Sequence, residues 1–114
     1  MLGKKSTDTK INTLIGAGAE LSGDFTLDGS ARIDGKIGGN VTVTGSLILG
    51  AGSVVTGEVQ AASVLIGGEV TGNITAPEKA ELTASAKVLG DIATKVIVID
   101  EHAIFQGKID MNQA

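Results

Sequence analysis

The chain lacks cysteine, tryptophan and tyrosine, and its 114 residues include one proline and two phenylalanines. Without cysteine it offers no disulfide framework and no thiolate metal site, which fits a reducing compartment. With so few aromatic side chains, a core has to be built from many small aliphatic contacts. The length allows one domain.

An excess of positive charge is also missing, since the formal net charge is −4 at pH 7. Proteins that bind nucleic acid need clustered Lys and Arg, usually with stacking aromatic residues, so we expect no nucleic-acid partner. Residues 1–11 lack the central apolar run of a secretory signal. Residues 37–57 carry no charge, but their Asn, Thr, Ser and Gly residues are poor material for a membrane span.

Glycine is abundant, with 17 residues, and six of the glycines belong to a repeat. The repeated pattern is a large apolar residue, any residue, glycine, a polar residue and a second large apolar residue. It occurs at residues 21–25, 37–41, 55–59, 70–74, 88–92 and 105–109. Its glycines are 16, 18, 15, 18 and 17 residues apart, and a period this regular predicts a solenoid.

The period is too short for helical repeats, which need about 33 residues or more. The segments between the glycines are rich in Val, Ile and Thr, and they alternate with period 2, as strands do when one face is buried. A coil of about 17 residues suits three short strands joined by tight bends. The sequence therefore predicts an all-β, single-domain parallel β-helix of about six coils.

Aligning the six copies produces columns of similar residues. The residues two before and two after each glycine are all large and apolar, so both columns are expected to face the core. The residue four before the glycine is always small, which indicates a crowded corner. The glycine itself is expected to turn the chain through a positive φ or a close backbone approach.

The column directly after the glycine is polar, and no two acids in it are neighbours. We expect it to face solvent, because acids in adjacent coils about 4.8 Å apart would repel one another. No column gathers carboxylates, so no metal site is predicted. The members of this column are Asp24, Asn40, Glu58, Asn73, Asp91 and Lys108.

The two ends of the solenoid are expected to be uncapped. Met1–Asn12 is polar, basic and short, and only residues 110–114 follow the last repeat, so the open edges should join another copy of the chain. The two phenylalanines occupy the first and last repeats. Two interpretations of Phe105 stay open: it forms an end-to-end contact with Ile104 and Ile109, or it only plugs the core. Phe25 and Leu21 are the candidate contact residues at the other end of the solenoid. For Phe25, the interpretation that it only plugs the core is favoured.

The repeated Gly-Asp-Ile-like signature, the apolar columns, the short basic N-terminal segment and the missing caps resemble the bactofilin family over residues 13–112. The resemblance implies a right-handed β-helix of six windings that polymerises without nucleotide into non-polar filaments, by head-to-head and tail-to-tail contacts. It further implies a bacterial cytoskeletal scaffold for cell-wall and shape-determining proteins at the inner face of the cytoplasmic membrane. Residues 1–12 and 113–114 would be tails of this domain.

The N-terminal segment is similar to the membrane-targeting segment of some bactofilins. Met1 and Leu2 could enter the interface of an anionic membrane while Lys4 and Lys5 meet the head groups. The alternative is a disordered tail that only aids solubility.

An enzyme is not expected. Residues 15–20 and 49–54 resemble isolated hexapeptides of β-helical acyltransferases, but a strict hexapeptide rhythm would hold a spacing of 18 residues, and this chain does not. The only histidine, His102, is expected on an exposed turn without a partner that completes a catalytic site. We predict no catalytic residue, no metal and no cofactor, and rank a filament-forming scaffold first, a β-helical interaction module of closed oligomeric state second and an acyltransferase third.

Overall fold

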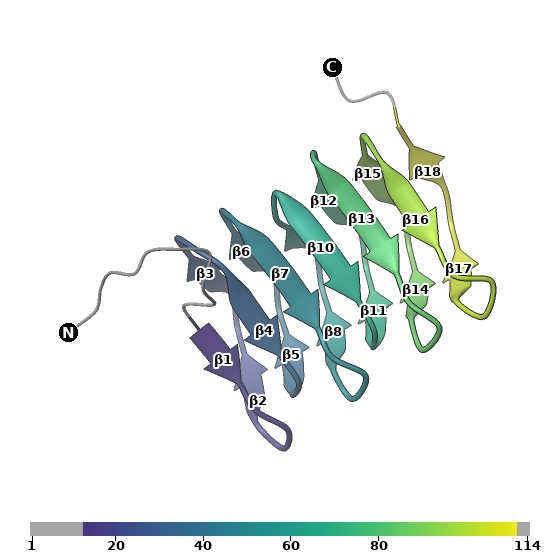
Figure 1. The fold of residues 1–114 in the computed structure, drawn as a ribbon. Coiled ribbons are helices and arrows are strands. Elements are labelled where there is room, and N and C mark those ends of the chain that lie inside the picture. Colours follow the sequence, from purple (N-terminus) through teal and green to yellow (C-terminus); the bar gives the residue numbers. More distant parts are fainter. Residues whose placement is uncertain (1–12, 112–114) are drawn as a thin grey trace.

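The computed structural model describes residues 13–111, which stack as six coils of three short strands each (Figure 1). The strands pair in parallel with the strands one coil away and build three sheets, here called A, B and C. In this part of the chain no helix is long and apolar enough to cross a bilayer. The predicted all-β solenoid is confirmed, whereas its predicted boundary at residue 112 and the tails 1–12 and 113–114 lie outside the described residues.

Each coil contributes one strand to each sheet, in the order A, B, C. Sheet A consists of β1 (Thr13–Ile15), β4 (Ala31–Ile33), β7 (Ser46–Leu49), β10 (Ser63–Ile66), β13 (Lys79–Leu82) and β16 (Ile97–Ile99). Sheet B consists of β2 (Glu20–Ser22), β5 (Lys36–Gly38), β8 (Val54–Thr56), β11 (Glu69–Thr71), β14 (Lys87–Leu89) and β17 (Ile104–Gln106). Sheet C consists of β3 (Phe25–Leu27), β6 (Val41–Val43), β9 (Val59–Gln60), β12 (Ile74–Ala76), β15 (Ile92–Thr94) and β18 (Ile109–Asp110).

The two predicted apolar columns form the sheet B and sheet C sides of the core of the interior coils, and inward residues of sheet A, such as Leu49, Ile66 and Leu82, form the third side. Their strands pair in register, as at Val41 with Val59 and at Ile74 with Ile92, so equivalent residues of successive repeats stack directly. Side chains of both columns in the four interior coils are at most 2% exposed. No aromatic residue takes part in these coils, so stacked valines, isoleucines, leucines and alanines supply the burial, as the composition predicted.

The glycine column is required for two physical reasons. Its five members from the second coil onward have φ between +141° and +155°, where L-residues with side chains are strained. In addition, a Cβ on any of them would collide with the backbone of the glycine one coil earlier. The predicted turn and the close approach are therefore both present. The five members are Gly39, Gly57, Gly72, Gly90 and Gly107.

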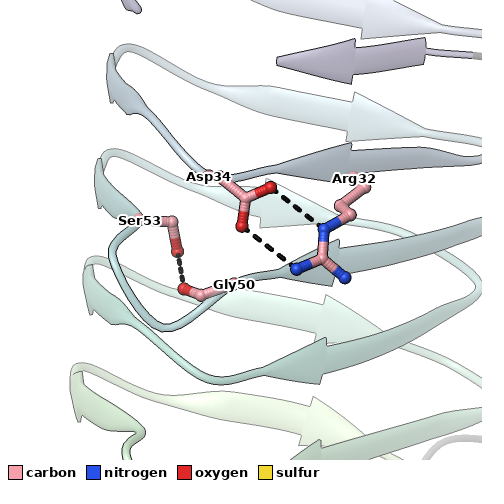
Figure 2. A network of polar contacts seen from close by, with 4 residues as sticks. All are labelled: Arg32, Asp34, Gly50 and Ser53. Atoms are coloured by element: carbon pink, nitrogen blue, oxygen red, sulfur yellow. Dashed lines mark hydrogen bonds and ion pairs between the residues drawn. The ribbon is translucent and has the colours of Figure 1, made fainter. Parts of the chain in front are cut away.

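The small column forms the predicted crowded corner between sheets A and B. Ser53 is 1% exposed, and its Oγ donates a hydrogen bond of 2.7 Å to the Gly50 carbonyl (Figure 2). One coil on, a Cβ on Gly68 would collide with the Ser53 hydroxyl and carbonyl. Any larger side chain at this corner would push successive coils apart.

The polar column after the glycine does more than face solvent. Its Asp and Asn side chains accept hydrogen bonds from the backbone N–H of the same column one coil later, and this role was not predicted. The bonds run from the N–H of Asn40 to Asp24 (3.1 Å), of Glu58 to Asn40 (3.0 Å), of Asp91 to Asn73 (3.2 Å) and of Lys108 to Asp91 (3.0 Å). Four of the five steps between coils are thus bridged by a short side chain that reaches the next turn.

Gly72→Ala tests the glycine column. Because the new Cβ meets the Gly57 carbonyl and the φ of +141° is strained for alanine, we expect the free energy of unfolding to fall by about 2–4 kcal/mol in urea denaturation followed by circular dichroism. The matched control is Gly52→Ala, whose Cβ finds its nearest atom, the Asp34 carbonyl oxygen, at 3.8 Å. The control should change stability by less than about 0.5 kcal/mol. Equal losses in both variants would contradict the stacking argument.

Candidate functional site at the ends of the solenoid

Among the described strands, those of the first and last coils have a neighbouring strand on one side only. Within residues 13–111, strands β1, β2 and β3 pair only with the second coil, and β16, β17 and β18 pair only with the fifth. The outer N–H and C=O groups of these strands have the geometry to accept a further strand. Both ends are therefore templates for pairing with another chain.

At the C-terminal end, no further coil among residues 13–111 covers the core side chains. Ile99 is 40% exposed, whereas Leu82 and Ile66 in the same column are 1% and 0% exposed. Phe105 and Ile109 are only half-buried and pack against the core from one side. We call this surface the C-terminal end face and define it as Ile97, Ile99, Phe105 and Ile109.

The N-terminal end shows the same change in sheets B and C, whereas Ile15 of sheet A is 9% exposed. Leu21 is 39% exposed, whereas its register partner Ile37 is 2% exposed. Phe25 and Leu27 are half-buried and pack against the core from the other side. Leu21, Phe25 and Leu27 make up the N-terminal end face.

The structure brings most, but not all, of the residues predicted for the end contacts into these faces. Phe105 and Ile109 lie in the inward columns of β17 and β18, as Leu21 and Phe25 do in β2 and β3. Ile104 is next to Phe105 and therefore points the other way. Its register partner is the exposed Lys87, and Ile104 itself is 49% exposed. Ile104 thus lies on the outer rim of the last coil and not in the open core.

The residues predicted to meet a membrane, Met1, Leu2, Lys4 and Lys5, lie outside the described residues.

His102 is on an exposed turn, as predicted. Its backbone N–H donates to Asp100 Oδ1 at 2.9 Å, and its Nδ1 lies 3.2 Å from the same oxygen. These hydrogen bonds, the backbone one first, lower the pKa of Asp100. The bonds close the turn locally and aim no group at a cavity. Among the described residues, no three His, Cys, Asp or Glu side chains gather as metal ligands would.

The repeat alignment did not single out the outer face of sheet A. Leu14 and Val98 on this face are 66% and 44% exposed, and Ile48 and Leu65 between them are half-buried. The signal in the sequence is the apolar residue at every position of Leu47–Leu49 and Val64–Ile66, where strict alternation would place a polar residue in the middle.

A family model for bactofilins, described as polymer-forming cytoskeletal, matches residues 13–110. A search of curated proteins found no match. Among solved structures, the chain is similar to that in a cryo-EM reconstruction of Thermus thermophilus bactofilin double helical filaments, with 38% identity, a TM-score of 0.81 and coverage of 85% of this chain and 96% of that chain. It is also similar to a crystal structure of bactofilin from Thermus thermophilus, F105R mutant in that protein's numbering, with 39% identity, a TM-score of 0.73 and coverage of 77% and 98%.

Proposed function

The chain belongs to the bactofilins, a family of polymer-forming cytoskeletal proteins, and we propose that it polymerises through its two end faces into non-polar filaments without nucleotide. The observation that carries the proposal is the change in exposure along two core columns, from 2% at Ile37 to 39% at Leu21 in sheet B and from 1% at Leu82 to 40% at Ile99 in sheet A. A second copy of the same end would restore the burial that every interior coil already has.

Magnitudes support an end contact that uses both side chains and backbone. Full burial of a large aliphatic or aromatic side chain stabilises by about 1.5–3 kcal/mol, so covering the roughly one-third of each side chain that is exposed on two facing C-terminal end faces contributes about 4–8 kcal/mol. Association itself costs about 4–15 kcal/mol, so side-chain burial alone is marginal. Pairing of the three edge strands, at about 0.5–1.5 kcal/mol per hydrogen bond, then favours assembly.

Assembly without nucleotide follows from the nature of these groups, because the apolar side chains and edge strands are already in place in the folded chain. Each end face is apolar and can pack against a copy of itself around a two-fold axis, with Phe105 of one chain beside Phe105 of the next. Successive chains would alternate in direction, and the filament would have no polarity.

We assign the chain a structural role and not a catalytic one, and we place its filaments at the inner face of the cytoplasmic membrane, where they hold cell-wall or shape-determining proteins. The support for this location is the N-terminal sequence, in which Met1 and Leu2 precede Lys4 and Lys5. One such segment binds weakly, since each lysine near an anionic surface contributes about 1 kcal/mol. Many copies along one filament bind together, and this avidity makes the attachment firm.

Phe105→Arg tests the end contacts. A charge placed in the C-terminal end face would have to be buried on assembly, so this contact should be lost while the fold remains. If the filaments are non-polar, the N-terminal contact survives and the variant sediments as a dimer. The matched control is Gln106→Arg, an exposed neighbour on β17, which should still form filaments in negative-stain electron microscopy. A monomer would instead indicate one head-to-tail contact, and unchanged polymerisation would remove Phe105 from the interface.

Exchange of Lys4 and Lys5 for glutamate tests the membrane proposal. The double variant should still polymerise, but its filaments should no longer co-sediment with vesicles that contain anionic lipid, because attraction to the head groups is replaced by repulsion. The control carries the same change of charge on the exposed face of sheet B, as Lys36→Glu with Lys87→Glu, and should co-sediment as wild type does. Equal binding by both double variants would refute a role of the N-terminal lysines.

A further inference from the structure

The outer face of sheet A differs from those of the other two sheets. One outward column of sheet B contains two pairs of opposite charge, Glu20 beside Lys36 and Glu69 beside Lys87, with Val54 between the pairs and Ile104 in the last coil. The outward column of sheet C is mostly Thr, Gln and Ala. In sheet A, four of the six residues of the middle outward column are large and aliphatic. From the first coil to the last, the column reads Leu14, Arg32, Ile48, Leu65, Glu81 and Val98.

This column is symmetric about its middle. Ile48 and Leu65 form the central pair, and the next positions outward are Arg32 on one side and Glu81 on the other. Leu14 and Val98 are at the two ends. Reversing the order of the coils therefore exchanges aliphatic residues with aliphatic residues and the basic residue with the acidic one.

The residues beside the central pair are small. Ser46 and Ser63 flank it on one side, and Gly50 and Gly67 flank it on the other. Ile48 and Leu65 consequently form a low apolar ridge between small residues, a shape that lets a second sheet approach to the usual packing distance of about 10 Å.

The two charged positions are held in place by neighbours on the same face. Arg32 Nε lies 3.0 Å from Asp34 Oδ2, and Arg32 Nη2 lies 3.3 Å from Asp34 Oδ1, so the guanidinium is bound at two points (Figure 2). At the other end of the face, Lys79 Nζ lies 3.5 Å from Glu81 Oε1. The four side chains sum to zero charge, so this face gives no general attraction to an anionic membrane, and it gives specific attraction only to a surface with the reverse order of charges.

We propose that this face binds a second copy of itself, so that two filaments pair side by side through sheet A. The two chains would be related by a two-fold axis that runs parallel to the strands, between the third and fourth coils. This axis places Ile48 of one chain opposite Leu65 of the other, Arg32 opposite Glu81 and Leu14 opposite Val98. The inference rests on the proposed filament, because pairing needs many chains in a row.

The size of the face explains this requirement. Six coils at about 4.8 Å and a width of about 13 Å along the strands give about 400 Å² per chain, or about 800 Å² for both partners. Stable interfaces bury about 1,200–2,000 Å², so one pair of chains would bind weakly. The proposal therefore requires end contacts that keep sheet A on the same side of successive chains, so that the contact recurs along the filament and the summed contacts make the pairing stable.

A charge-reversal experiment tests the pairing. In Arg32→Glu two acids would face each other across the contact, and in Glu81→Arg two basic groups would do so; each variant should form single filaments. When preformed filaments of the two variants are mixed, the new acid at position 32 of one variant meets the new base at position 81 of the other. The unchanged Glu81 and Arg32 also meet, so paired filaments should return.

Mass per length from scanning transmission electron microscopy should be double for wild type and for the mixture, relative to either variant alone. Lys87→Glu on sheet B is the control, and its filaments should remain paired.

Any other result of this experiment would contradict the proposal. Paired filaments of either single variant, or a mixture that stays single, would show that sheet A does not pair by this two-fold arrangement. Single wild-type filaments would contradict the pairing and leave the end contacts intact, whether sheet A then binds a membrane or a different protein. Absence of any wild-type filament would contradict the proposed polymerisation and the pairing together.

Discussion

Every coil of this solenoid depends on the coil beside it for its hydrogen bonds and for half of its core. Strands of two to four residues cannot pair within one coil, so the backbone is satisfied only along the axis of the stack. The same stacking covers the apolar columns and reduces exposure from 39% at Leu21 to 2% at Ile37 one coil later. A coil has all its hydrogen bonds and its full core only between two neighbouring coils. The coils at the two ends of the stack lack one neighbour, and this constraint favours assembly with another chain.

The short distance between coils also determines at which positions the residue type can vary. Glycine is required where successive backbones touch, as at Gly57 and Gly72, and only small residues fit the corner at Ser53. Asp or Asn is useful after the glycine because its side chain reaches the next backbone N–H. The outward columns carry none of these constraints. They can therefore specify contacts, with charge on sheet B, threonine on sheet C and an apolar ridge on sheet A.

Much of this arrangement could be predicted from the sequence. The regular spacing of the glycines predicted the coils and the inward columns, and thus the positions of Phe105 and Ile109. The outer column of sheet A was hidden because the bend between sheets A and B varies in length: Arg32 and Leu65 are seven residues before their glycines, whereas Ile48 and Glu81 are nine before theirs. Alignment on the glycines therefore places register partners in different columns. The hydrogen bonds of the polar column depend on distances between coils, which the sequence does not contain.

If the end faces pair as proposed, the solenoid continues across the contact between chains. Cryo-electron microscopy of wild-type filaments, grown at neutral pH without nucleotide or metal, measures this directly through the spacing of coils along the filament axis. With six coils per chain at about 4.8 Å, and with neighbours that alternate in direction, we expect unbroken coil spacing and an axial rise of about 58 Å per pair of chains. A gap in the coil spacing at the contacts, or filaments joined through the sides of the solenoid alone, would contradict the proposed end-to-end assembly.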